Sequence, residues 1–126
     1  MLDKLKNILL SLKDEQKPVW LFAVVKMDEL ADRWTLIISA PWVTTENRAI
    51  EFQSLVDKLK KVFDAKELES IARISFLTKD DHLTEELLKR HAGDKIKNEP
   101  VNGNIIHEGE IIESNPDLAF NPVSVE

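Results

Sequence analysis

Two consecutive segments, VWLFAVVKM at 19–27 and RWTLIISA at 33–40, constrain the fold more than any other part of the chain. Both are rich in β-branched and aromatic residues, which favour strands, and only the five residues DELAD separate them. A connection this short joins neighbouring strands that run antiparallel. Both segments are apolar at successive positions, so we expect a hairpin inside a sheet that is covered on both faces.

The remaining segments predict three helices and two further strands. Residues 2–15 carry leucine and isoleucine at helical spacing, and Pro18 prevents this helix from continuing. SIARISFLT at 70–78 alternates between apolar and polar residues, which is typical of a strand. The other expected elements are a helix from Thr44 or Thr45 to about Phe63, a short helix that begins at Asp80 or Asp81, and a strand within NIIHEGEIIE at 104–113. The order α-β-β-α-β-α-β predicts a single layered α+β domain, with a mainly antiparallel sheet and helices packed on it.

The chain of 126 residues carries its net charge of −6 in one segment. Residues 1–97 contain all 17 Lys and Arg and 17 of the 23 Asp and Glu. We therefore expect a charge-neutral α+β core at 1–97, followed by an acidic C-terminal segment at 98–126 with a short strand or hairpin and an extended tail. A neutral core disfavours nucleic-acid binding, because such binding depends on neutralising phosphates. The favoured interpretation of the acidic segment is that it keeps the protein soluble. The alternative is that it binds a basic protein partner.

The composition also bears on the compartment. The chain contains no cysteine, which excludes disulfides, thiol nucleophiles and thiolate metal sites. The first residues lack the apolar core and cleavage site of a signal peptide. The longest apolar run, VWLFAVV, has seven residues, against the roughly 20 needed to cross a bilayer. We expect a cytoplasmic protein that does not bind membranes.

The stretch IIHEGEIIE at 105–113 is nearly symmetric about Gly109 and resembles a metalloprotease signature only superficially. That chemistry needs two histidines four residues apart on one helix face, whereas position 111 is isoleucine. Gly109 disfavours a helix. We interpret the stretch as a turn at Gly109, with Ile106 opposite Ile111, or as a bulged edge strand.

Three histidines are the natural candidates for a metal or acid–base site. His82 and His91 lie at the two ends of the predicted short helix, where capping and the helix dipole already explain them. Across a turn at Gly109, His107 would lie near Glu110. A metal site of His82, His107 and Glu110 is the less favoured interpretation, because the turn supplies only two ligands and the third must come from elsewhere. We expect no cofactor.

The second and third strands offer a different kind of site. If they lie side by side, Thr35 and Ser39 can share a sheet face with Arg73 and Ser75. An arginine among hydroxyls is a cradle for an anion or carboxylate, because the guanidinium group offers paired donors. The favoured alternative is a partly solvated face on which Arg73 pairs with a glutamate. Trp42 joins the ligand-binding candidates, because we expect this tryptophan to be partly exposed beyond the second strand.

The motifs of several enzyme classes are absent from the sequence. It contains no glycine-rich phosphate loop and no G-x-S-x-G elbow. The aromatic hairpin and the acidic, partly apolar tail favour a non-catalytic interaction or regulatory module that binds a protein partner or itself. The alternative is a small-ligand-binding protein or an enzyme, with a site on the Arg73 face or at His82 and His107. An enzyme is the less favoured possibility.

Overall fold

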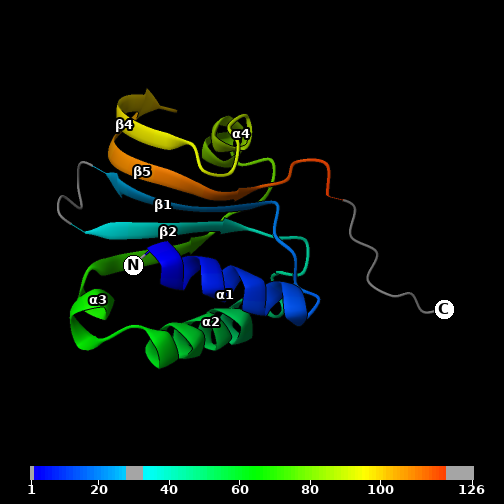
Figure 1. The fold of residues 1–126 in the computed structure, drawn as a ribbon. Coiled ribbons are helices and arrows are strands. Elements are labelled where there is room, and N and C mark those ends of the chain that lie inside the picture. Colours follow the sequence, from blue (N-terminus) through cyan, green and yellow to red (C-terminus); the bar gives the residue numbers. More distant parts are fainter. Residues whose placement is uncertain (1, 28–32, 119–126) are drawn as a thin grey trace.

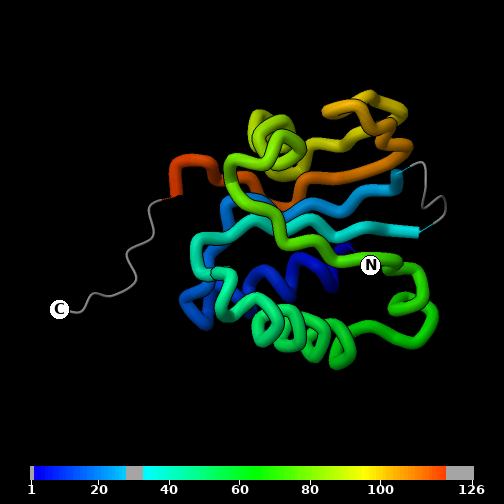
Figure 2. Tube along the Cα trace, turned by 180° about the vertical axis from the view of Figure 1, so that it is seen from behind, coloured from blue at the N-terminus to red at the C-terminus, as the bar shows by residue number. Residues whose placement is uncertain are grey.

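The computed structural model describes residues 2–27 and 33–118 of the chain (Figures 1 and 2). The DELAD connection at 28–32 lies outside the described residues, as do the apolar tail residues Phe120, Val123 and Val125. What the sequence indicates about these two segments stays a prediction.

The described residues form one five-stranded sheet with four helices, which confirms the predicted α+β domain and its mainly antiparallel sheet. The strands are β1 (Leu21–Met27), β2 (Trp34–Ser39), β3 (Ile71–Phe76), β4 (Lys95–Val101) and β5 (Asn104–Ser114). Their order in space is β3-β2-β1-β5-β4, and every neighbouring pair is antiparallel except β2 with β3. The β1–β2 hairpin therefore lies inside the sheet, as its two apolar faces require.

Helices cover both faces of this sheet. They are α1 (Leu2–Asp14), α2 (Arg48–Val62), α3 (Ala65–Glu69) and α4 (His82–Leu88). On one face α1 and α2 lie side by side, and Phe22 and Leu55 belong to the buried cluster between them and the sheet (Figure 1). α4 covers the other face, where Ala23, Leu87 and Ile111 belong to a second cluster (Figure 2). Phe22 and Ala23 enter different clusters because successive strand side chains point to opposite faces.

The parallel pair β2–β3 is joined by a crossover that contains α2 and α3, the kind of connection that parallel strands need. α2 begins at Arg48, with Asn47 as its N-cap instead of the predicted Thr44 or Thr45. The Asn47 Oδ1 atom accepts a hydrogen bond from the Thr44 backbone N–H at 2.7 Å, which shapes the loop before the helix. α4 begins after Asp81, one of its two predicted caps.

The predicted turn at Gly109 is wrong. β5 continues through this glycine and pairs with β1 on one side and β4 on the other, so it is not an edge strand. Gly109 lies opposite Val25 of β1, and a Cβ atom on Gly109 would lie 3.0 Å from Val25 Cγ1. The absence of a side chain at Gly109 therefore allows β5 to lie close to β1. The actual turn lies at Asn102 and Gly103, whose φ angles of 50° and 80° suit a two-residue hairpin.

Two β-bulges bend β5. Its register with β1 shifts between Phe22 and Ala23 and again between Lys26 and Met27. Bulges bend a strand and increase its twist. Asn102 and Asn104 of the β4–β5 hairpin line a pocket together with residues of β2 and β3, although β3 and β4 are opposite edges of the sheet. β4 and α3 are elements that the sequence pattern did not predict.

Candidate functional site

Three of the residues predicted for the Arg73 face line one pocket. β2 and β3 do lie side by side, with Thr35 opposite Arg73 and Ile37 opposite Ser75. Residues in register on neighbouring strands present their side chains on the same face. Thr35, Arg73 and Ser75 all line a pocket of about 290 Å³, which we call the Arg73 pocket.

Two further elements close the Arg73 pocket. Asp81 and Leu83, at the start of α4, line it from one side, and Asn102 and Asn104 line it from the β4–β5 hairpin. The left-handed backbone at Asn102 is one that asparagine adopts more readily than most residues. The sequence VNGN at 101–104 therefore supports the tight turn that brings two amide side chains to the pocket.

The Thr35 hydroxyl is the polar group of this pocket that most needs an explanation. Thr35 is only 2% exposed, and its Oγ1 atom has no hydrogen-bond partner among the described residues. Leaving a buried hydroxyl without a partner costs roughly 1–3 kcal/mol. Such a group is expected where a ligand or an ordered water completes the hydrogen bonding.

The pocket also contains a cation, Arg73, and a carboxylate, Asp81. The Asp81 carboxylate accepts hydrogen bonds from the backbone N–H groups of Leu83, at 2.9 Å, and Thr84, at 3.4 Å. These amides belong to the positive end of α4, which favours the negative charge of Asp81. Arg73 is exposed and brings a guanidinium group with paired donors. The arrangement is therefore suited to a small polar ligand with an anionic group.

The other two predicted ligand-binding residues do not line the Arg73 pocket. Ser39 lies further along β2, opposite Leu21, and is 1% exposed, and its hydroxyl has no hydrogen-bond partner within the described part of the chain. Trp42 is half-buried and packs against the cluster under α1 and α2. Its indole N–H donates to the Pro18 carbonyl at 2.7 Å, and its ring meets Phe76 edge-on at 6.5 Å.

The structure does not bring the predicted metal ligands together. His82 lies at the start of α4, whereas Glu110 is opposite Val24, on the face covered by α1 and α2. His107 is exposed on β5. Across residues 2–27 and 33–118, no group of three histidine, aspartate or glutamate side chains is placed to hold a metal ion.

A second pocket, which we call the β2–β3 end pocket, was not predicted. It measures about 530 Å³ and lies where the chain leaves β2 at Ala40 and β3 at Leu77, next to Arg48 at the start of α2. The carboxyl ends of parallel strands are a common place for ligands in open sheets. The feature that indicates a pocket here is the parallel pairing of β2 and β3. The local sequence pattern does not reveal this pairing, so the pocket could not be predicted.

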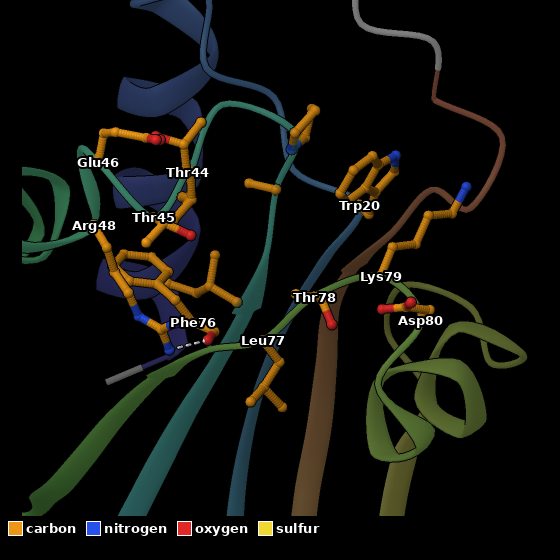
Figure 3. Close-up of a pocket in the computed structure, with 14 residues that line it drawn as sticks. Trp20, Thr44, Thr45, Glu46, Arg48, Phe76, Leu77, Thr78, Lys79 and Asp80 are labelled. Carbon is orange, nitrogen blue, oxygen red and sulfur yellow. Dashed lines mark hydrogen bonds between the residues drawn. The ribbon is translucent and has the colours of Figure 1, made fainter.

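Figure 3 shows how side chains are arranged around the β2–β3 end pocket. The Arg48 guanidinium donates a hydrogen bond to the Phe76 carbonyl at 2.5 Å, which ties the first turn of α2 to the end of β3. Trp20 and Lys79 lie on the other side, beside the segment that follows β5. The pocket is thus bordered by both the crossover and the C-terminal segment.

Two carboxylates have shifted pKa values, and neither lines the two pockets. A hydrogen bond from the Lys58 ammonium lowers the pKa of Glu15. Hydrogen bonds from the Lys4 ammonium and from the Asp64 backbone N–H lower the pKa of Glu67. Both carboxylates connect helices on one face of the sheet, so their shifts reflect structural contacts.

No known protein family, curated protein sequence or solved structure matches this chain. Within the described residues, none of the helices has the length and apolar character needed to cross a membrane.

Proposed function

We propose that the protein is a non-catalytic binding module that recognises a small polar ligand with a carboxylate or another anionic group in the Arg73 pocket. The observation that carries this proposal is the Thr35 hydroxyl, which is 2% exposed, has no hydrogen-bond partner among the described residues, and lines the same pocket as an arginine. The pocket volume of about 290 Å³ is just below the roughly 300–1,000 Å³ typical of ligand sites. This favours a ligand the size of a short carboxylic acid over a nucleotide.

The side chains around the pocket support recognition more than reaction chemistry. A hydroxyl nucleophile needs an adjacent general base. Among the described residues that line the pocket, none is a histidine, lysine or cysteine, and the Asp81 carboxylate is held by backbone N–H groups of α4.

A cytoplasmic location belongs to the same proposal, and the absence of cysteine is consistent with it.

A titration of the full chain tests this proposal. Acetate, succinate, glycine and inorganic phosphate are added separately, while amide chemical shifts and the melting temperature are measured. We expect at least one probe to shift the amides of Thr35, Arg73 and Asn104 and to raise the melting temperature. At a ligand concentration 100 times the Kd, the free energy of unfolding should rise by about 2.7 kcal/mol.

Three variants make the titration specific. Arg73→Gln removes the cation and Thr35→Val removes the hydroxyl while keeping the shape of the side chain, so both should lose the response. Arg33→Gln changes an arginine just before β2 that does not line the pocket, and it should respond like the wild type. Equal responses in all three variants, or no shift at the pocket with any of the four probes, would contradict the proposal.

Self-association through the edge of β3 is a second candidate function. β3 is at one end of the strand order, so its outer side has no neighbouring strand among the described residues. Phe52 of α2 is 40% exposed and its ring lies 6.5 Å from that of Phe76 at the end of β3. An open strand edge beside an exposed aromatic ring favours pairing with a second copy of the chain.

A further inference from the structure

The charged groups of the Arg73 pocket come from two different elements. Arg73 lies on β3, and Asp81 lies in the connection between β3 and α4, where it caps the helix. These two side chains are the charged ones among the ten described residues that line the pocket. The formal charge of the lining is therefore zero, with one positive and one negative group.

The Asp81 carboxylate has one oxygen atom left for a ligand. Its two hydrogen bonds, from the backbone N–H groups of Leu83 and Thr84, both go to Oδ1. The Oδ2 atom accepts no hydrogen bond from the described residues. Asp81 is half-buried. Because each oxygen of an ionised carboxylate accepts hydrogen bonds, Oδ2 can bind a donor such as an ammonium group.

We propose that the ligand of the Arg73 pocket is a small amino acid, whose carboxylate binds Arg73 and whose ammonium group binds Asp81. This ligand class rests on the function proposed above and makes it more specific. A guanidinium group has five N–H donors, and two of them can hold one carboxylate. An ammonium group has three donors, so it can bind Asp81 and a neutral acceptor at the same time.

Four neutral polar side chains can complete the hydrogen bonding of the two charged ends. The Thr35 hydroxyl is buried without a partner among the described residues and can both donate and accept. Ser75 follows Arg73 by two residues, on the same face of β3. Asn102 and Asn104 add amide groups, and Asn104 Nδ2 donates to the Asn102 backbone carbonyl at 3.4 Å. The ligand would thus give the Thr35 hydroxyl the partner that it lacks.

The remaining four lining residues are apolar and suit the carbon chain of an amino acid. Met27 and Ile37 are buried in the sheet, and Leu77 and Leu83 are half-buried. Contact with these side chains removes the apolar part of the ligand from water. A pocket of about 290 Å³ leaves room for a short chain.

Ligands that carry one kind of charge match this lining less well. A dicarboxylate or a phosphate brings additional negative charge towards Asp81, and a diamine brings positive charge towards Arg73. A monocarboxylate matches Arg73 but leaves Asp81 without an opposite charge. An amino acid matches both groups, which favours it over the other three classes.

Matched pairs of ligands test the inference on the full chain. L-Alanine is compared with propionate, and 4-aminobutyrate with butyrate, so that only the ammonium group differs within a pair. The Kd values are measured at neutral pH from the amide shifts of Thr35, Arg73 and Asn104. We expect the amino acid of at least one pair to bind about tenfold more tightly than its acid, because it gains a charge-assisted hydrogen bond. The pair that shows this preference also gives the separation of the two charges.

Two variants assign the preference to Asp81. Asparagine caps a helix as well as aspartate does, so Asp81→Asn removes the charge and keeps the start of α4. It should weaken the binding of the amino acid to about that of its acid, while the acid binds no less tightly than before. Asp80→Asn changes the neighbouring carboxylate, which does not line the Arg73 pocket, and should keep the preference.

The results separate this inference from the function on which it rests. Equal binding of acid and amino acid in both pairs would overturn the amino acid as ligand and leave the anion-binding function standing. A preference that survives Asp81→Asn would also overturn it. So would a loss of acid and amino acid alike in that variant, because Asp81 would then act only on the fold of α4. If none of the four compounds shifts the pocket amides, both proposals fail.

Discussion

At the scale of single residues, Gly109 sets how closely β5 approaches β1. A Cβ atom at this position would lie 3.0 Å from Val25 Cγ1 and 3.1 Å from the Val24 carbonyl oxygen. Val25 is fully buried, and the Val24 carbonyl belongs to the backbone of the central strand. Neither atom has room to move away without disturbing the pairing of β1 with β5.

Gly109→Ala should therefore destabilise the protein by about 1–3 kcal/mol, the range for overpacked cores. The reduced entropy of the unfolded chain acts in the other direction by at most about 1 kcal/mol. Urea denaturation of wild type and variant measures the difference. In the double variant with Val25→Ala the Val25 methyl is gone, so the combined loss should be smaller than the sum of the two single losses. Strict additivity would show that the Val25 contact is not the cause.

At the scale of elements, α3 is a five-residue helix that depends on one glutamate for two contacts. The Glu67 carboxylate accepts from Lys4 Nζ of α1 at 2.6 Å and from the Asp64 backbone N–H at 3.0 Å. The Asp64 carboxylate in turn accepts from the Glu67 backbone N–H at 2.8 Å, which completes a capping box. Glu67 thus starts α3 and also ties it to α1.

These contacts predict a pH dependence. They hold the pKa of Glu67 below its ordinary value of 4.5, with the Lys4 hydrogen bond as the largest cause. A group whose pKa is lower in the folded state contributes full stability above its unfolded pKa. That contribution is lost as the pH falls through the folded pKa.

Glu67→Gln should consequently lower the urea midpoint at pH 7, and its difference from the wild type should shrink as the pH falls below 4.5. Glu69→Gln changes a carboxylate of the same helix and serves as the control. A difference between Glu67→Gln and wild type that stays constant from neutral to acid pH would refute this account of Glu67.

At the scale of the whole molecule, the sheet has two edges, and they are protected differently. β4 contains Pro100 and three charged residues, Lys95, Lys97 and Glu99, features that discourage edge pairing. β3 has Arg73 as its charged residue and adjoins the exposed ring of Phe52. If the chain associates with itself, β3 is the edge that we expect to take part.

Sedimentation velocity over a range of protein concentrations tests this expectation. The wild type should shift from monomer towards dimer as the concentration rises. Phe52→Lys should raise the concentration needed for dimerisation, since it places a charge in the contact. Ile50→Lys, on the outward side of α2 and 71% exposed, is the control and should change little. A monomer at all concentrations, or equal effects of both substitutions, would contradict a dimer through β3.

Much of the fold could be predicted because its signals are local. The apolar runs of β1 and β2, the alternation in β3 and the helical spacing in α1 depend on neighbours in sequence. Asp80 and Asp81 are recognisable as candidate caps for the same reason, and Asp81 is the cap in the structure. Gly109 was misassigned because a glycine required for close strand approach resembles a turn glycine until its cross-strand neighbours are known.

The candidate site was only partly predictable. Thr35, Arg73 and Ser75 follow from strand alternation once β2 and β3 are taken as neighbours. Asp81, Asn102 and Asn104 complete the pocket from distant segments, and no local pattern connects them with Arg73.

The sequence by itself determined the types of all elements except α3 and β4, the burial of both faces of the β1–β2 hairpin, and the start of α4 to within Asp80 or Asp81. The tertiary structure alone decided that β3 pairs parallel to β2, that β5 enters the sheet beside β1, and that the β4–β5 hairpin contributes Asn102 and Asn104 to the Arg73 pocket. Local propensity specifies how a segment folds. Strand order and register depend on contacts between segments far apart in the chain, which form only when the whole core packs.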